Sequence, residues 1–369
     1  MNLLYIITGL GMGGAEKQTV LIANKMYEAG HNVMIISLTG ETLVKPDDGV
    51  RLIELKLEKT PFSLFKGLFK VRGVMKKFKP DVVHSHMFHA NLFSRILRIF
   101  TKIPVLICTA HNTNEGSSLR MLVYKYTDKL ASLSTNVSQD AVDSFIRKGA
   151  SSSGRMIVVS NGIDASQFDF SMNDRQAKRL ELGILDDTPI LLSVGRLTEA
   201  KDYPNLLTAF SLLIKDNNYQ KSPRLFIVGT GHLDNQLKSM AKEFGIEKYV
   251  TFLGHREDIR QLMCAADIFV LSSEWEGFPL VITEAMACKK MIVATDAGGI
   301  TEALGDCGSI VPIKNPKMLS QEIDKMINLP DEEKEILGHK VRERIIQRNS
   351  IEKIIDRWTS IYTQYSHNS

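Results

Sequence analysis

The sequence predicts an α/β protein made of two Rossmann-like, doubly wound domains. Short apolar runs that are typical of buried strands alternate with amphipathic helical segments along the chain. A length of 369 residues suffices for two domains of ordinary size. A polar stretch over Asn161–Asn173 separates the two series of strands. We therefore expect one domain over residues 1–165 and another over residues 166–350, facing each other across a cleft.

Each expected strand is a short apolar run bounded by polar or glycine-rich residues. The first series comprises Leu3–Thr8, Val33–Leu38, Arg51–Leu55, Val82–His84, Val105–Thr109, Ser132–Val137 and Met156–Val159. The second comprises Ile190–Val194, Arg224–Val228, Val250–Leu253, Asp267–Leu271, Ile292–Thr295 and Ser309–Val311. Helical patterns such as Ala15–Ala29 and Pro204–Ile214 lie between them, so the sheets should be parallel. The last amphipathic stretch, about 351–369, follows a complete series and is expected to pack back onto the first domain.

Composition indicates a soluble globular protein of the cytosol. Hydrophobic residues make up 44% and charged residues 24%, and no apolar run is long enough to cross a membrane as a helix. The apolar start is followed at once by a glycine-rich turn, so it reads as a first strand rather than a signal peptide. The four cysteines show no close spacing, which argues against disulfides and a zinc cluster.

Charge is distributed unevenly along the chain. Residues 1–165 carry a net charge of +8 and the remainder −4, so an anionic partner is expected for the first domain. The most basic stretch is Lys59–Lys79, which has no acidic residue and contains interleaved apolar side chains. It could bind an anionic membrane surface, or it could be a surface helix with one buried face and one solvated lysine face. No nucleic-acid motif accompanies it, so nucleic acid is not an expected partner.

The most informative segment contains two carboxylates, Glu276 and Glu284. A strand over Asp267–Leu271 runs toward Glu276, and Pro279 suits the first turn of a helix that carries Leu280–Cys288. A helix N-terminus attracts anions. Two carboxylates beside such an end suit a ligand that has both phosphates and hydroxyls, which is the chemistry of a nucleotide sugar.

Two basic residues follow the first strand of the second series. Arg196 offers a fork of donors and Lys201 a point charge, and together they could hold a diphosphate without a metal. The chain has no D-x-D sequence, a common arrangement for binding Mg²⁺ or Mn²⁺. The alternative is that both residues are ordinary surface charges.

Glycine turns end two further strands of the second series. Gly229 and Gly231 allow the backbone to approach a ligand, and Gly254, followed by His255 and Arg256, repeats the pattern and could receive the base. Ligands bind beyond the carboxyl ends of strands in doubly wound sheets. We therefore expect these turns to line a ligand-binding site.

The first domain opens with a glycine-rich turn. Gly9, Gly11 and Gly14 match the dinucleotide fingerprint, but no acidic residue ends the second strand as a nicotinamide site requires. Gly13 and Gly14 could instead let backbone N–H groups approach a diphosphate. A tight turn that needs glycine only for its conformation is the third interpretation.

Histidines gather at two strand ends of this domain. His111 follows Val105–Thr109 and is placed to touch a bound sugar, although a loop histidine without a role is an alternative. His84 and His86 stand with His89 at the end of another strand. They could line the acceptor side, pack in the interior or face solvent. No cysteine accompanies them, so we expect no metal site.

In order, these motifs resemble the retaining glycosyltransferases of family 4, which have the GT-B fold. The matching residues span nearly the whole chain: Gly13-Gly14-Ala15-Glu16, Asn161-Gly162-Ile163-Asp164, Gly195-Arg196-Leu197 with Lys201, Gly229-Thr230-Gly231, Phe252-Leu253-Gly254, and Glu276-Gly277-Phe278-Pro279 with Glu284. One departure is Phe278-Pro279, where Phe-Gly is commoner in the family.

The resemblance implies a role for each matching position. In the first domain, Gly13 and Gly14 would approach the donor diphosphate or the acceptor, and His111 would contact the donor sugar. In the second, Arg196 and Lys201 would hold the diphosphate. The carboxylates and the adjoining backbone would bind sugar and ribose: Glu276 the sugar hydroxyls, with Gly277, Phe278, Pro279 and Leu280 nearby, and Glu284 the ribose hydroxyls.

The resemblance also implies an activity and its surroundings. A sugar would move with retention from a nucleoside diphosphate, for which UDP is favoured, and front-face attack is favoured over a covalent intermediate. No metal or other cofactor is expected. A lipid-linked saccharide at the inner membrane face, in bacterial surface polysaccharide assembly, is the expected acceptor. We therefore expect a cytoplasmic protein that can associate peripherally with the membrane. An NAD-dependent oxidoreductase and a non-catalytic carbohydrate-binding protein stay open as alternatives.

Overall fold

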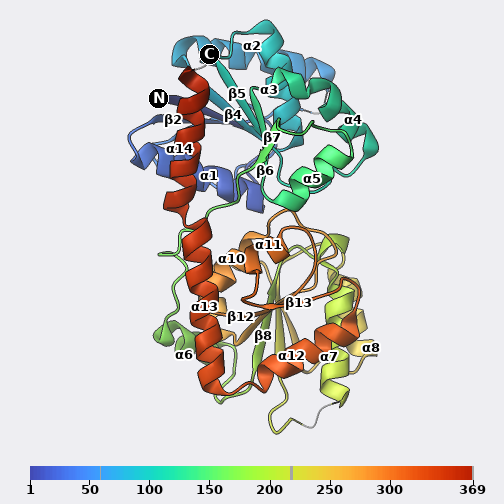
Figure 1. Cartoon of the computed structure of the whole chain (residues 1–369). Helices are drawn as coiled ribbons and strands as arrows, with labels where there is room; N and C mark the ends of the chain where they lie inside the picture. The colour runs from blue at the N-terminus through green and yellow to red at the C-terminus, as the bar shows by residue number, and fades with distance from the viewer. Residues whose placement is uncertain (59, 217–218, 368–369) are drawn as a thin grey trace. The chain divides into compact units, whose positions relative to one another are not determined.

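The computed structural model describes residues 1–58, 60–216 and 219–367 (Figure 1). Lys59, the first residue of the basic stretch, lies outside the described residues. The chain divides into two compact units, of which the first contains Met1–Gly162 with Ile351–Ser369 and the second Ile163–Ser350. Each unit has its own parallel sheet with helices between successive strands. The structure thus confirms the predicted α/β class with two Rossmann-like domains.

The strands of the first unit form a parallel sheet in the order β3-β2-β1-β4-β5-β6-β7. Their bounds are β1 (Asn2–Ile7), β2 (Asn32–Ser37), β3 (Arg51–Glu54), β4 (Val82–His86), β5 (Val105–Thr109), β6 (Leu133–Asn136) and β7 (Met156–Val158). Successive residues of β1 pack on opposite faces of the sheet, because side chains alternate along a strand. Leu3 and Tyr5 join one hydrophobic cluster, and Leu4 and Ile6 join another.

Helices cover both faces of this sheet, which explains why its central strands are apolar throughout. They are α1 (Gly14–Glu28), α2 (Pro61–Phe78), α3 (Phe88–Phe100), α4 (Ser118–Thr127), α5 (Gln139–Arg147) and α14 (Ile351–His367), with a short 3-10 turn η1 (Asp128–Leu130). Three of these helices are capped at their N-termini by a side-chain hydroxyl. The hydroxyls of Thr60, Ser117 and Ser138 each accept a hydrogen bond from a backbone N–H of the first turn of α2, α4 and α5.

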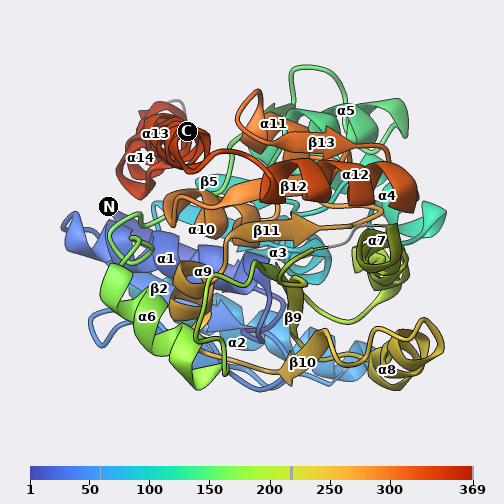
Figure 2. The same cartoon turned by 90° about the horizontal axis from the view of Figure 1, so that it is seen from below.

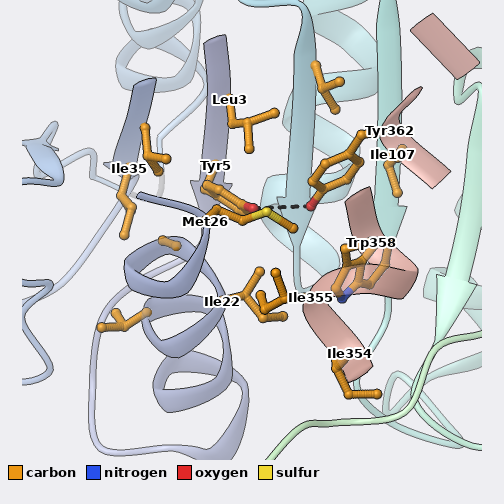
Figure 3. Packing of buried hydrophobic residues seen from close by; sticks show 14 of the residues in the cluster. Leu3, Tyr5, Ile22, Met26, Ile35, Ile107, Ile354, Ile355, Trp358 and Tyr362 are labelled. Atoms are coloured by element: carbon orange, nitrogen blue, oxygen red, sulfur yellow. Dashed lines mark hydrogen bonds between the residues drawn. The ribbon is translucent and has the colours of Figure 1, made fainter. Parts of the chain in front are cut away.

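The C-terminal helix α14 is part of the first unit's core. Trp358 and Tyr362 are buried against the same cluster as β1 and α1 (Figure 3), and α14 lies beside α1. The Tyr362 hydroxyl is hydrogen-bonded to that of Tyr5 at 3.1 Å. The last helix of the chain therefore covers the face of the sheet on which Leu3 and Tyr5 of β1 lie.

The second unit contains a parallel sheet in the order β10-β9-β8-β11-β12-β13. The strands are β8 (Ile190–Val194), β9 (Arg224–Val228), β10 (Val250–Gly254), β11 (Ile268–Leu271), β12 (Met291–Thr295) and β13 (Ser309–Val311). Its order reverses between β8 and β11, where consecutive connections leave in opposite directions. A crevice for ligands is expected at such a switch point, outside the carboxyl ends of the strands.

The helices of the second unit lie between these strands and after them. They are α6 (Met172–Glu181), α7 (Tyr203–Asp216), α8 (Asp234–Glu243), α9 (Ile259–Ala265), α10 (Leu280–Ala287), α11 (Ile300–Leu304), α12 (Pro316–Ile327) and α13 (Asp331–Asn349), with a 3-10 turn η2 (Glu199–Lys201). Figure 2 shows α6 alongside α9, two helices that contact each other. Side chains of α7, α8 and α12 share one buried cluster with the strands.

Every predicted strand is present within two residues of its predicted bounds. The largest difference is at β4, which continues to His86 instead of ending at His84. The extension follows from pairing on both sides, because His86 lies opposite Ile7 of β1 and Thr109 of β5. Ladder pairing thus keeps two histidines in a buried strand, where polar side chains alone suggested a loop.

Candidate active site

Loops at the carboxyl ends of the second unit's strands are joined through their backbones. Gly195 N–H donates to Val228 O at 2.9 Å, and Gly229 N–H donates to Gly254 O at 2.8 Å. Further bonds link the loops after β8, β11 and β12: Glu274 N–H to Ala200 O and Gly299 N–H to Gly277 O. The structure therefore brings the predicted donor-binding loops together at one edge of one sheet, where doubly wound sheets bind ligands.

Two glycines are required by this close approach. Gly229 has a φ of +138°, and a Cβ there would lie 1.9 Å from Gly195 O. A Cβ on Gly231 would lie 2.2 Å from Leu197 O. Any side chain at either position would push the loops apart, so both glycines shape the edge at which the predicted site lies.

Lys201 and Glu276 form an ion pair at this edge. Lys201 ends η2 after β8, and Glu276 lies in the loop after β11; their side chains are only 16% and 13% exposed. Glu276 Oε1 accepts hydrogen bonds from Lys201 Nζ and, at 2.6 Å, from Ser273 Oγ. Among the described residues no group donates to Glu276 Oε2. This oxygen can therefore accept from a ligand hydroxyl, while Lys201 keeps N–H donors for an anion.

Arg196 and Glu284 lie in different environments. The Arg196 side chain is exposed, and no ion-pair partner for it exists among the described residues. Glu284 lies on α10 and is only 6% exposed. A buried carboxylate at a strand-end helix is placed to accept hydrogen bonds rather than to form a surface ion pair.

Helix α10 begins one residue later than predicted. Pro279 is its N-cap, with φ −74° and ψ 113°, and Leu280 is the first helical residue. The extended ψ of Pro279 explains the difference, because an N-cap residue is not yet helical. Phe278 is buried at 6% exposure, and Gly277 O accepts the hydrogen bond from Gly299. The segment after Glu276 is therefore held by its neighbours.

The loop after β10 differs from the expected base-binding surface at one residue. His255 is exposed, and Gly254 has a φ of +66°. The Arg256 guanidinium, however, donates to Asp258 at 2.6–2.7 Å and to Glu181 at 2.8 Å. Its pKa is raised by these hydrogen bonds, Asp258 first. Arg256 is thus committed to carboxylates of its own unit, not directed at a donor.

In the first unit, the N-terminus of α1 holds a carboxylate of the chain itself. Gly13 is the N-cap and Gly14 the first helical residue. A Cβ on Gly13 would lie 2.3 Å from Glu16 Oε2, so the Glu16 carboxylate folds back over this end. An acid in the first turn is favoured by the helix dipole. The position predicted to approach a diphosphate therefore already carries a negative charge.

His84 is a core residue, as the packed alternative describes. It is 1% exposed, and its ring lies 4.5 Å from that of Trp358 on α14. Its two nitrogens are hydrogen-bonded to Tyr362 Oη at 2.7 Å and Thr109 Oγ1 at 2.6 Å. Burial lowers its pKa well below the usual value. An acceptor could not reach His84 without removal of α14, which corrects the expected acceptor-side position.

His86 is buried in the same way, and it contacts His111. His86 is 1% exposed, so it does not line an accessible acceptor surface either. Its Nδ1 lies 3.0 Å from His111 Nε2. His111 is half-buried in the loop after β5, and burial lowers its pKa to about 4. The two predicted histidines therefore form a neutral pair at neutral pH.

Sequence reasoning missed Ser273, which binds Glu276. Ser273 precedes Glu276 by three residues, a spacing that allows a hydrogen bond between their side chains within one loop. Serines are so common in loops that this spacing alone did not single it out. Also missed was the exposed apolar face of α4, formed by Leu119, Leu122 and Tyr126. Its spacing of three and four residues could have revealed it, but such a stripe usually predicts a buried face.

Within residues 1–58, 60–216 and 219–367, no group of three or more histidine, cysteine or acidic side chains is arranged to hold a metal ion. None of the helices in that part of the chain combines the length and apolar character needed to cross a bilayer.

Comparison with known proteins gives matches over both units. The profile described as Glycosyltransferase Family 4 matches residues 12–167, and that described as Glycosyl transferases group 1 matches residues 174–349. The UDP-Gal:alpha-D-GlcNAc-diphosphoundecaprenol alpha-1,3-galactosyltransferase of Escherichia coli is 27% identical over 93% of this chain and 90% of its own.

A further relative and a solved structure are similar to this chain over nearly its whole length. The GalNAc-alpha-(1->4)-GalNAc-alpha-(1->3)-diNAcBac-PP-undecaprenol alpha-1,4-N-acetyl-D-galactosaminyltransferase of Campylobacter jejuni is 26% identical over 92% of each chain. The crystal structure of Anabaena Alr3699/HepE in complex with UDP superposes with a TM-score of 0.82 at 22% identity, over 99% of this chain and 100% of that one. With both units matched by family profiles and the fold shared throughout, this chain belongs to the family 4 glycosyltransferases of GT-B fold.

Proposed function

We propose that this protein transfers a sugar, with retention, from a UDP-sugar to a hydroxyl of a lipid-linked saccharide. The observation that carries the proposal is the cluster of Lys201, Glu276 and Ser273 beside exposed Arg196 at the strand ends of the second unit. It combines two cations for a diphosphate, Lys201 held by Glu276 and Arg196 exposed, with a carboxylate oxygen that is open to a sugar hydroxyl. The second unit would bind the donor and the first unit the acceptor.

The proposed reaction separates charge at the diphosphate. The bond from the anomeric carbon to the β-phosphate oxygen breaks, and the acceptor oxygen forms a bond to the same carbon on the same face. The acceptor proton moves to the departing phosphate oxygen. Arg196 and Lys201 would stabilise the negative charge that grows there, and their guanidinium and ammonium groups supply this stabilisation without a metal or other cofactor.

A lipid-linked acceptor is supported by the relatives. The names of the Escherichia coli and Campylobacter jejuni enzymes each include a saccharide linked through diphosphate to undecaprenol. An acceptor with a long apolar chain lies in a membrane, so this protein would meet it at a membrane surface.

Helix α2 has the surface that such an encounter requires. Its buried residues, Gly67, Val71, Met75 and Phe78, fall on one face. The aromatic side chains of Phe62, Phe65 and Phe69 are instead 78%, 58% and 56% exposed, on a helix that has several lysines and no acid. The alternative of a purely solvated lysine face does not account for exposed phenylalanines. An anionic membrane satisfies both the aromatic and the basic side chains.

Helix α4 adds a second exposed apolar face to the same unit. Leu119 and Tyr126 are 69% and 74% exposed, and Leu122 is 45% exposed. The first turn has no acid, and Lys125 lies in the last turn. Large exposed apolar patches mark interaction sites. We therefore include α4 in the proposed membrane-facing surface.

Binding to vesicles tests this surface. We expect the chain to bind vesicles that contain an anionic phospholipid and to dissociate as salt is raised, because a cationic helix loses its attraction when screened. The double substitution Phe65→Ser with Phe69→Ser should weaken binding about tenfold or more, since each aromatic ring loses its contact with the lipid. Ile336→Ser, at an exposed apolar residue of the second unit, is the control. Binding that depends on neither lipid charge nor salt would contradict the proposal.

Glu284 is expected to bind the ribose of the nucleotide. We expect Glu284→Ala to weaken UDP binding about 10- to 100-fold in calorimetry, because hydrogen bonds to a charged acceptor contribute roughly 1.5–3 kcal/mol. Glu284→Gln, which keeps an acceptor oxygen, should lie between the wild type and Glu284→Ala. The exposed Glu243 on α8 supplies the control, Glu243→Ala. An unchanged UDP affinity in a folded Glu284→Ala protein would remove Glu284 from the site.

A screen of donors tests the function itself. The purified chain is incubated with UDP-sugars, other nucleotide sugars and lipid-linked acceptors, and products are read by mass spectrometry. We expect a glycosylated acceptor and free UDP in equal amounts. Affinity for a nucleotide sugar without release of nucleoside diphosphate would instead indicate a non-catalytic carbohydrate-binding protein.

A further inference from the structure

The side chains of His86 and His111 contact each other, and this contact bears on which ring nitrogen of each histidine carries the proton. His86 ends β4, and His111 follows β5 by two residues. Because β4 and β5 are parallel neighbours, with His86 opposite Thr109, the two histidines emerge at the same edge of the sheet. His86 Nδ1 and His111 Nε2 are 3.0 Å apart, which is a hydrogen bond in which either ring could donate.

The His86 ring is held so that it cannot exchange its two nitrogens. It is 1% exposed and packs against the rings of His84, at 4.1 Å between centroids, and Tyr5, at 6.0 Å. His84 is itself fixed by hydrogen bonds to Tyr362 and Thr109. Rotation of His86 would therefore require the core beneath α14 to open.

The other nitrogen of His86 determines which ring donates. His86 Nε2 is buried and has no hydrogen-bond partner in the part of the chain that the structure describes. A neutral imidazole carries one N–H. If His111 donated, the His86 proton would be on Nε2, where a buried N–H would have no acceptor. If His86 donates from Nδ1, Nε2 is only an unused acceptor. Buried N–H groups without an acceptor are the rarer of the two defects, so the second arrangement is favoured.

We propose that His86 is a positioning residue that donates from Nδ1 to His111 Nε2 and so holds the single proton of His111 on Nδ1. In this tautomer, His111 presents an N–H donor. Among the described residues no group is hydrogen-bonded to His111 Nδ1, and His111 is only half-buried. Resting on the proposed function, the ligand of that N–H is a hydroxyl or phosphate oxygen of a bound substrate.

Nitrogen spectroscopy of the ligand-free full chain tests the proton positions directly. Histidine side chains labelled with ¹⁵N are observed at neutral pH through long-range couplings from the ring protons, and signals are assigned with His111→Asn and His86→Asn variants. We expect His86 and His111 both to carry the proton on Nδ1. A proton on His111 Nε2, or rapid exchange of His111 between both tautomers, would overturn the proposal.

Substitutions of His86 test the consequence for transfer. His86→Leu removes the donor, and we expect kcat/KM for the nucleotide sugar to fall roughly fivefold to tenfold, the scale of one hydrogen bond, while UDP affinity is unchanged. His86→Asn keeps an N–H donor on the atom attached to Cγ and should restore most of the activity. Equal activity of folded His86→Leu and wild-type protein would overturn the positioning role, as would equal losses in both variants.

Failure of the inference and failure of the proposed function give different results. If no nucleotide sugar is consumed by the wild type, the proposed function fails, yet the ¹⁵N spectra still decide the proton arrangement. If transfer is observed but the spectra show His111 protonated on Nε2, only the inference fails. Thermal unfolding of each variant identifies a loss of activity that comes from misfolding.

Discussion

Replacing Lys201 by alanine is expected to lower kcat by roughly 10²–10³, the scale of losing one directed charge donor in a transition state. The Lys201 ammonium is only 16% exposed and is held by Glu276, so it is pre-positioned rather than recruited by the substrate. Rates would be measured as UDP released under saturating donor. Lys215→Ala, at an exposed lysine of α7, is the control. Near-normal turnover of Lys201→Ala would refute its role.

A second variant separates two explanations for such a loss. Lys201→Ala also leaves the partly buried Glu276 carboxylate without its counter-ion, which could by itself disturb the loop. If Lys201 acts on the diphosphate, its removal should cost the same factor in a Glu276→Gln background. If Lys201 only neutralises Glu276, the Lys201→Ala with Glu276→Gln double variant should be as active as Glu276→Gln alone. A double-mutant cycle therefore assigns the effect.

The strands were predictable because each one is a local pattern. Runs such as Ile190–Val194 are buried on both faces of a parallel sheet, so nearly every residue is apolar and the run is conspicuous in sequence. β4 was predicted too short because its last residues are polar: His84, Ser85 and His86 are kept in the strand by pairing with β1 and β5. Pairing with strands that are distant in sequence determines where such a strand ends, and the local sequence pattern does not contain this information.

The donor-binding loops were predictable for a different reason. Parallel strands bring their carboxyl ends to one edge, so residues after several strands gather there without any further information. The partners of each side chain were not predictable. Lys201 and Glu276 lie 75 residues apart in sequence and pair in space, and Arg256, which looks equally available in sequence, is neutralised by Asp258 and Glu181.

The glycine-rich turn of the first unit illustrates how a motif can fit two families. Its spacing also satisfies the nicotinamide fingerprint, and only the missing acidic residue at the second strand argued against that site. The family profile over residues 12–167 begins within the turn and includes its Gly13 and Gly14. In the structure, Glu16 places its carboxylate against Gly13, where a dinucleotide pyrophosphate would have to lie.

Replacing Trp358 by alanine is expected to destabilise the first unit by about 3–5 kcal/mol, the usual cost of removing a buried tryptophan. Trp358 is 2% exposed, and its ring lies near those of Tyr362 and His84 in the cluster that α14 shares with β1 and α1 (Figure 3). The loss should appear in urea unfolding followed by circular dichroism. If the two units unfold in separate transitions, only the transition of the first unit should shift to a lower urea concentration.

The chain provides its own control for this prediction, because it has one other tryptophan. Trp275 is 49% exposed in the second unit, so Trp275→Ala should change stability by no more than about 0.5 kcal/mol. Unfolding of Trp358→Ala at the wild-type urea concentration would contradict the conclusion that α14 completes the core. The expected loss would mean that the C-terminal helix stabilises the fold of the first unit. The same helix holds His84 through Tyr362, and the His84 ring packs against that of His86.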